Sequence, residues 1–135
     1  MIEVELKKII IDEKREEQVI VLKEKKGQRQ FPIIIGYMEA TSIKMKLSGV
    51  KPLRPMTHDL LIATINGLEA TLDCLIIDKM IDSTFHAKLR IKTKEGEEKM
   101  IDTRPSDGIA LAVRAGAPIF VEDEVLNQAA IFKIE

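Results

Sequence analysis

The chain opens with alternating apolar and charged side chains. Over residues 2–7 every second side chain is apolar, which is typical of a strand with one buried face. The isoleucine run at 9–11 breaks this phase and predicts a β-bulge or burial on both faces. Apolar segments at 19–22 and 30–35 predict two further strands, and Pro32 favours a sheet edge or a strand end because proline donates no ladder hydrogen bond. We therefore expect the opening third to form a three-stranded meander.

Apolar residues at helical spacing predict helices in four other segments. These segments are residues 37–48, 57–68, 105–115 and 123–130. Thr57 and Ser106 stand where an N-cap is needed, because a side-chain oxygen at that position accepts a backbone N–H of the first turn. After the last helix, Phe132 and Ile134 are expected to pack the tail against the rest of the domain.

Strand patterns return in the second half of the chain. We expect strands at residues 70–81, 85–92, 98–103 and 119–121. The second of these alternates cleanly, and its polar face carries His86 among basic residues; that face is either solvated or a contact for phosphate. Gly108 falls in the first turn of the third helix, where glycine costs about 1 kcal/mol relative to alanine. Its presence indicates close backbone packing.

Together these elements predict one α+β domain over residues 1–135. The strands come in groups rather than in strict alternation with helices, so the sheet is expected to be largely antiparallel, with six or seven strands and three to four helices packed on it. A chain of 135 residues with 45% hydrophobic residues is long enough to bury a core. The lone Cys74 lies in a predicted central strand and is interpreted as a small core residue.

Composition narrows the possible partners. The 21 basic and 22 acidic residues leave a net charge of -1, which argues against a broad nucleic-acid-coating surface but allows a local basic patch. Charges interrupt every apolar run, so we expect no membrane span or signal peptide and a cytoplasmic protein. Abundant Ile, Lys and Glu hint at a thermophilic source. Isoleucine-rich strand edges and an alanine-rich helix favour a homodimer or a larger homo-oligomer.

Two similar polar motifs precede helices. The first Arg-Pro box, residues 54–59, reads Arg-Pro-Met-Thr-His-Asp, and the second Arg-Pro box, residues 102–107, reads Asp-Thr-Arg-Pro-Ser-Asp. Each has a hydroxyl and an acidic residue where a cap and the helix dipole need them, so a purely structural role and a catalytic role are weighted equally. On the preceding helix, Glu39, Ser42 and Lys46 are expected on a solvated face, with a role for Glu39 in a site as the alternative.

Several segments, taken together, resemble the bifunctional nuclease family. They are residues 31–36 with Glu39 and Ala40, the first Arg-Pro box with Leu60, Thr84, Phe85 and Ala87, the second Arg-Pro box through Arg114, and residues 117–120. This resemblance implies a compact α+β domain, often oligomeric, with activity on RNA and DNA in some plant members. Gly108 stands where the family usually has alanine, and Ser42 where it has a small apolar residue. Neither change removes a polar residue of a box.

Phosphodiester cleavage needs an activated nucleophile, a proton donor for the leaving oxygen and positive charge around the phosphorus. His58 is the box residue that titrates near neutral pH, so it is the candidate acid or base. Carboxylates suit Mg²⁺ or Mn²⁺, and Asp59, Asp102 and Asp107 are the candidate ligands. The candidate catalytic residues are His58, Asp59, Asp102 and Asp107, and the candidate substrate-binding residues are Arg54, Thr57, Arg104, Ser106 and Arg114.

Three hypotheses follow, and all depend on whether the two boxes meet. The first is a nuclease of low sequence specificity, assisted by a metal ion, that cuts RNA or DNA. The second is a module that binds nucleic acid or a phosphorylated ligand without cutting it. The third is an oligomeric scaffold in which the boxes only hold helices together.

Overall fold

The computed structural model describes residues 1–130, so the prediction for Phe132 and Ile134 lies outside the described residues. Within that range the strands are β1 (Ile2–Ile10), β2 (Glu17–Glu24), β3 (Gln30–Gly36), β4 (Thr71–Ile81), β5 (Thr84–Lys92), β6 (Glu98–Thr103) and β7 (Ile119–Val121). The helices are α1 (Tyr37–Leu47), α2 (Thr57–Gly67), α3 (Pro105–Ala115) and α4 (Asp123–Ala129).

All of these strands join one sheet in the order β3-β2-β1-β7-β4-β5-β6. Every pairing is antiparallel except that of β4 with β7, which confirms the predicted α+β class with a largely antiparallel, mixed sheet. The three-residue strand β7 links two antiparallel meanders, because it pairs with β1 on one side and with β4 on the other. Pro32 lies in the edge strand β3, as expected.

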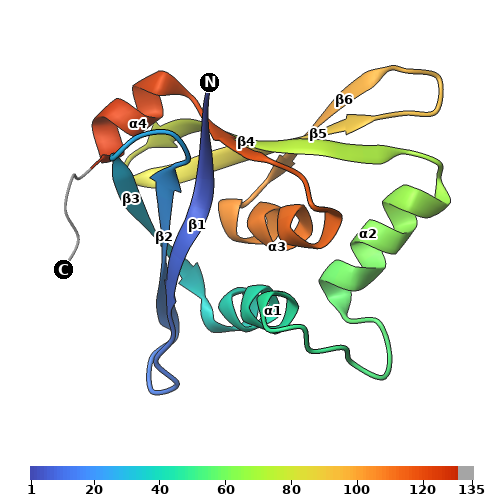
Figure 1. The fold of residues 1–135 in the computed structure, drawn as a ribbon, viewed down its shortest axis with the longest axis horizontal. Coiled ribbons are helices and arrows are strands. Elements are labelled where there is room, and N and C mark those ends of the chain that lie inside the picture. The colour runs from blue at the N-terminus through green and yellow to red at the C-terminus, as the bar shows by residue number, and fades with distance from the viewer. Residues whose placement is uncertain (131–135) are drawn as a thin grey trace.

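Strand irregularities follow the sequence closely. The register of β1 against β2 shifts between Leu6 and Lys8, so a bulge is present slightly earlier than the isoleucine run that predicted it. Strand β4 carries two such shifts against β5, one between Leu72 and Cys74. Cys74 itself is 1% exposed, which confirms its core position. The bulges let long strands bend, and Figure 1 shows the sheet curving around the helices.

Helix α3 lies at the centre of the molecule. Figure 1 shows it beneath β4, with α1 and α2 on its other sides, and it contacts all three. Its small residues allow this, because a Cβ on Gly108 would lie closer to Leu75 Cδ1 than van der Waals contact allows, and 3.2 Å from Thr103 Cγ2. The predicted close packing at Gly108 is confirmed. The starts of the neighbouring helices are thereby brought close to α3.

Both predicted N-caps are wrong by one or two residues. Thr57 is the first residue of α2, and the cap position belongs to Met56, whose backbone N–H donates to Asp59 Oδ2 at 3.0 Å. In α3 the cap position belongs to Arg104, and Ser106 is a buried residue of the first turn. Pro105 explains the second shift, because its fixed φ suits the first helical position. Within residues 1–130, no helix is both long enough and apolar enough to cross a membrane.

Candidate functional site

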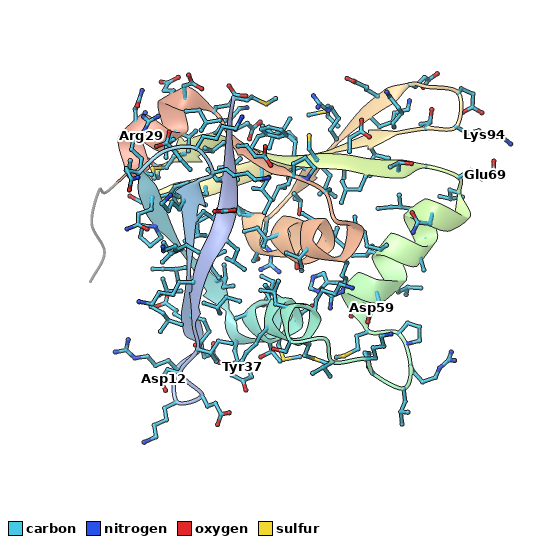
Figure 2. All side chains as sticks on the ribbon, in the orientation of Figure 1. Asp12, Arg29, Tyr37, Asp59, Glu69 and Lys94 are labelled. Carbon is cyan, nitrogen blue, oxygen red and sulfur yellow. The ribbon has the colours of Figure 1, made fainter. Side chains whose placement is uncertain are left out.

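The two Arg-Pro boxes meet through a histidine. His58 is the buried residue of α2, and its ring lies between α1 and α3. The ring Nδ1 is 2.7 Å from Ser42 Oγ of α1, and the ring Nε2 is 2.9 Å from Asp107 Oδ1 of α3. Figure 2 shows the next residue, Asp59, at the start of α2 beside α1. A residue of the first box thus binds a residue of the second across 49 positions of sequence.

Hydrogen-bonding roles follow from the partners of Asp107. Its other oxygen, Oδ2, accepts from Arg104 Nε at 3.2 Å and from Arg104 Nη2 at 3.1 Å. A carboxylate only accepts, so the neutral imidazole of His58 carries its proton on Nε2. Nδ1 then offers a lone pair, and the Ser42 hydroxyl donates to it. Each hydrogen bond in the series from the Ser42 hydroxyl through the His58 imidazole to the Asp107 carboxylate therefore has one donor and one acceptor.

Arg104 extends this network to the start of α1. Its Nη2 lies 3.0 Å from Glu39 Oε2, so one guanidinium serves two carboxylates. The hydrogen bond to Asp107 is the main cause of the raised pKa of Arg104, with the charge of Glu39 adding to it. The Glu39 side chain is only 16% exposed. The expectation of a solvated face is therefore wrong for Glu39, and its role in a site stays a prediction.

Asp59 and Arg114 form a second tie between the same helices. Arg114 Nε donates to Asp59 Oδ1 at 2.8 Å, while its other nitrogens donate to the backbone oxygens of Ala110 at 3.0 Å and Ser42 at 3.3 Å. The Arg114 side chain is 8% exposed. Its hydrogen bond, followed by the one from the Met56 backbone, holds the pKa of Asp59 below its ordinary value. Each of its three nitrogens thus donates to the protein, and Arg114 ties α3 to α1 and α2; its predicted role in substrate binding stays a prediction.

The carboxylates predicted to bind Mg²⁺ or Mn²⁺ do not gather. Asp102 lies on β6 with a 79% exposed side chain, opposite Lys88 of β5, whose Nζ is 3.6 Å away. Asp59 is engaged by Arg114, and Asp107 by His58 and Arg104. Across residues 1–130 no three His, Cys, Asp or Glu side chains are arranged to hold a metal ion. The three candidate ligands are therefore not brought together in this part of the chain.

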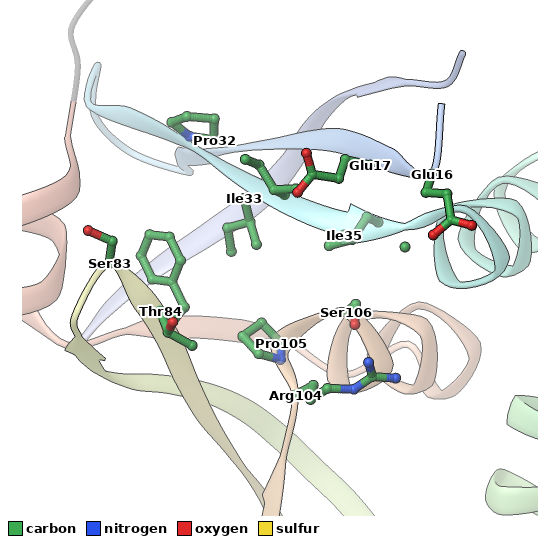
Figure 3. Close-up of a pocket in the computed structure, with 13 residues that line it drawn as sticks. Glu16, Glu17, Pro32, Ile33, Ile35, Ser83, Thr84, Arg104, Pro105 and Ser106 are labelled. Carbon is green, nitrogen blue, oxygen red and sulfur yellow. The ribbon is translucent and has the colours of Figure 1, made fainter. Parts of the chain in front are cut away.

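A groove of about 560 Å³ opens beside the start of α3. Figure 3 shows Arg104, Pro105 and Ser106 on one side of it and Ile33 and Ile35 of β3 on the other. Ser106, a predicted substrate-binding residue, is thus on its wall, but His58 and Asp107 are not among its lining residues. The groove and the histidine network are neighbours that share Arg104 rather than one continuous site.

Positive charge is concentrated in the last turn of α1 and in the loop that leads to α2. No acidic residue occurs between Glu39 and Asp59, whereas this stretch contains four exposed cations, which we name the basic segment: Lys44, Lys46, Lys51 and Arg54. None of the four forms an ion pair with another side chain of residues 1–130. Exposed Thr57 lies three residues beyond Arg54. The basic segment therefore leads directly in sequence to His58 and its network.

Two network members were missed or misplaced by the sequence. Glu39 and Ser42 lie one turn apart on α1, and nothing in their spacing pointed to His58 or Arg104. The one available signal was Ser42 itself, a polar residue at a position where the family that this sequence resembles usually has a small apolar one. His58 and Asp107, by contrast, were predicted to share a site and are in direct contact.

One protein family and two individual proteins are similar in sequence to this chain. The profile described as the bifunctional nuclease domain matches residues 20–133. Two proteins of Mycobacterium tuberculosis, one from strain CDC 1551 / Oshkosh and one from strain ATCC 25618 / H37Rv, are each 37% identical to this chain over 129 residues. The matched region is 96% of this chain and 76% of each relative, and both relatives are described as uncharacterized.

Proposed function

This chain belongs to the bifunctional nuclease domain family, and from that premise we propose that it hydrolyses phosphodiester bonds of RNA, DNA or both with low sequence specificity. The observation that supports a catalytic centre is the contact of His58 with Asp107, because it joins the two Arg-Pro boxes at one titratable ring. A helix cap needs no histidine. An imidazole held in one tautomer by a carboxylate is suited to moving protons at neutral pH.

Each group in the proposal has a distinct task. His58 transfers protons, Asp107 orients its ring, and Arg104 holds the Asp107 carboxylate in place through its other oxygen. The basic segment holds the nucleic-acid backbone, because its four cations are exposed and form no ion pairs within the described residues. Asp102 is left out of the centre because its side chain points to solvent beside Lys88.

The test uses a matched pair of histidine variants. The chain has two histidines, and His86 lies on β5 outside the network, so His86→Gln is the control for His58→Gln. We expect highly purified His58→Gln and Asp107→Asn to lose at least about 100-fold in cleavage of single-stranded RNA or DNA, the size typical of lost acid–base catalysis. His86→Gln should cleave like the parent. Cleavage that persists in both site variants would trace the activity to a contaminant.

A non-catalytic binding module is the second candidate, and the basic segment favours it. In that case the protein binds single-stranded nucleic acid with an affinity that falls steeply with salt, and no substrate is cut. Neutralising Lys46 and Arg54 should weaken binding and reduce the salt dependence. A binding signal without turnover in the purified parent would decide for this module over the nuclease.

The surface of α2 supports the expected homo-oligomer. His58 is its buried residue, whereas four large apolar side chains are at least 43% exposed: Met56, Leu60, Leu61 and Leu68. We propose that two copies meet through this face, because such a set is seldom left in water. Sedimentation should give a dimer for the parent and a monomer for Leu60→Glu. A parent that sediments as a monomer at high micromolar concentration would contradict the proposal.

A further inference from the structure

Ser42 completes an array that the nuclease proposal does not use. Its hydroxyl oxygen is 2.7 Å from His58 Nδ1, and the opposite ring nitrogen is 2.9 Å from Asp107 Oδ1. A hydroxyl beside an imidazole that is oriented by a carboxylate is the recurring arrangement of an activated nucleophile. We propose that Ser42 is a catalytic nucleophile that forms a covalent bond to the phosphorus of the substrate. This inference rests on the proposed nuclease function.

The position of Ser42 in α1 supports a directed role. A serine inside a helix usually turns its hydroxyl to a backbone oxygen of the preceding turn, or to solvent. Here the hydroxyl is directed across to α2 instead, although serine is a poorer helix former than alanine. The His58 side chain is 11% exposed, whereas Ser42 is half-buried. Ser42 as a residue is therefore less deeply buried than the imidazole it contacts.

The substrate class follows from the surrounding charge. Lys46 lies one turn beyond Ser42 on the same side of α1, and it belongs to the basic segment. A phosphodiester that approaches Ser42 would therefore meet positive charge, which stabilises the extra charge that develops on the phosphoryl oxygens. Glu39 lies one turn before Ser42, and its carboxylate pairs with Arg104, which also pairs with Asp107. A phosphoryl centre fits this setting better than an uncharged acyl ester.

The proposed reaction has two steps and needs water as its only co-substrate. His58 Nδ1 takes the Ser42 proton as Oγ attacks phosphorus, and the protonated ring then gives that proton to the departing ribose oxygen. A Ser42-linked phosphodiester and one free strand end remain. Water then attacks phosphorus, His58 takes its proton, and Ser42 Oγ leaves and is reprotonated. The net reaction consumes one water molecule for each bond cleaved.

Two measurements on the purified chain test the proposal. An alkyl fluorophosphonate probe reacts with an activated serine by forming a serine–phosphorus bond and releasing fluoride, and peptide mass spectrometry locates the label. We expect label on Ser42 and none on the exposed Ser48, and at least about tenfold less label on Ser42 in His58→Gln. Ser42→Ala should lose about 100-fold or more in nucleic-acid cleavage, while the control Ser48→Ala keeps the parent rate.

The outcomes separate this inference from the nuclease proposal. Cleavage that is lost in His58→Gln but retained in Ser42→Ala would keep the nuclease and overturn the nucleophile, leaving Ser42 as a residue that positions the ring. Unlabelled Ser42 would overturn the covalent step even if Ser42→Ala were inactive. Labelled Ser42 in a parent that cuts no nucleic acid would support the activated serine and overturn the nuclease. Melting temperatures of all variants are compared first, so that unfolding is not taken for lost chemistry.

Discussion

Two ion pairs flank α2, and they should differ greatly in their contribution to stability. At its start Asp59 pairs with Arg114 at 2.8 Å, and just past its end Glu69 pairs with Lys94 at the shorter distance of 2.6 Å. The side chains of the second pair are 61% and 68% exposed, whereas Arg114 is 8% exposed. Solvent screens the exposed pair, and a buried guanidinium has no water to replace a lost partner. Burial, not distance, should therefore decide the energies.

Asp59→Ala should lower the free energy of unfolding through two lost interactions. Asp59→Ala removes the hydrogen bond that caps α2, worth about 1 kcal/mol. It also leaves Arg114 Nε without its acceptor; that costs about 2 kcal/mol, below the value for a fully buried pair because Asp59 is 31% exposed. The total loss is about 3 kcal/mol. Lys94→Met should cost less than about 0.5 kcal/mol, and it avoids the positive φ of Glu69.

Guanidinium-induced unfolding of both single variants measures these values directly. A double-mutant cycle of Asp59→Ala with Arg114→Ala should give a coupling of about 1 to 2 kcal/mol, since the two groups share one interaction. Equal losses for Asp59→Ala and Lys94→Met would refute the reasoning. A coupling near zero would show that the capping bond alone explains the effect of Asp59.

Three further outcomes are expected. Gly108→Ala should lower stability by about 1 kcal/mol, because overpacking against Leu75 costs about 1 to 3 kcal/mol and exceeds the helix-propensity gain of about 1 kcal/mol. Adding Leu75→Val should recover the loss in a denaturation assay. A Gly108→Ala variant that is more stable than the parent would count against the close approach. Asp102→Asn should change stability by less than about 0.5 kcal/mol and leave cleavage intact, because the side chain is 79% exposed; lost cleavage would return Asp102 to the centre. The pKa of Asp59 is lowered in the folded state, so its stabilising contribution is present above the unfolded-state pKa of about 4 and is lost as the pH falls through the folded-state value. The difference in unfolding free energy between the parent and Asp59→Asn should therefore become smaller from pH 7 to pH 3 in urea titrations. A constant difference would show that the charge contributes nothing.

Most of the fold was predictable because it depends on local patterns. Alternation along β5 and the helical spacing in α1 to α3 are properties of neighbouring residues, and each predicted element is present within a few residues. Pro32 at a sheet edge, Cys74 in the core and Gly108 in a tight contact were also expected from single residue types. Cap positions were less accurate, since Pro105 starts its helix one residue before the serine that looked like the cap.

Which residues form the histidine network could not be predicted from local patterns. The sequence by itself determined that two similar boxes precede helices and that His58 is their titratable residue. Only the packing of α1 and α2 against α3 decided that His58 touches Asp107 and Ser42, and that Arg104 reaches Glu39. Asp102 shares a box with Arg104 and Asp107, yet its place in β6 directs it beside Lys88. Contacts between distant segments depend on where helices and strands pack, and no local spacing carries that information.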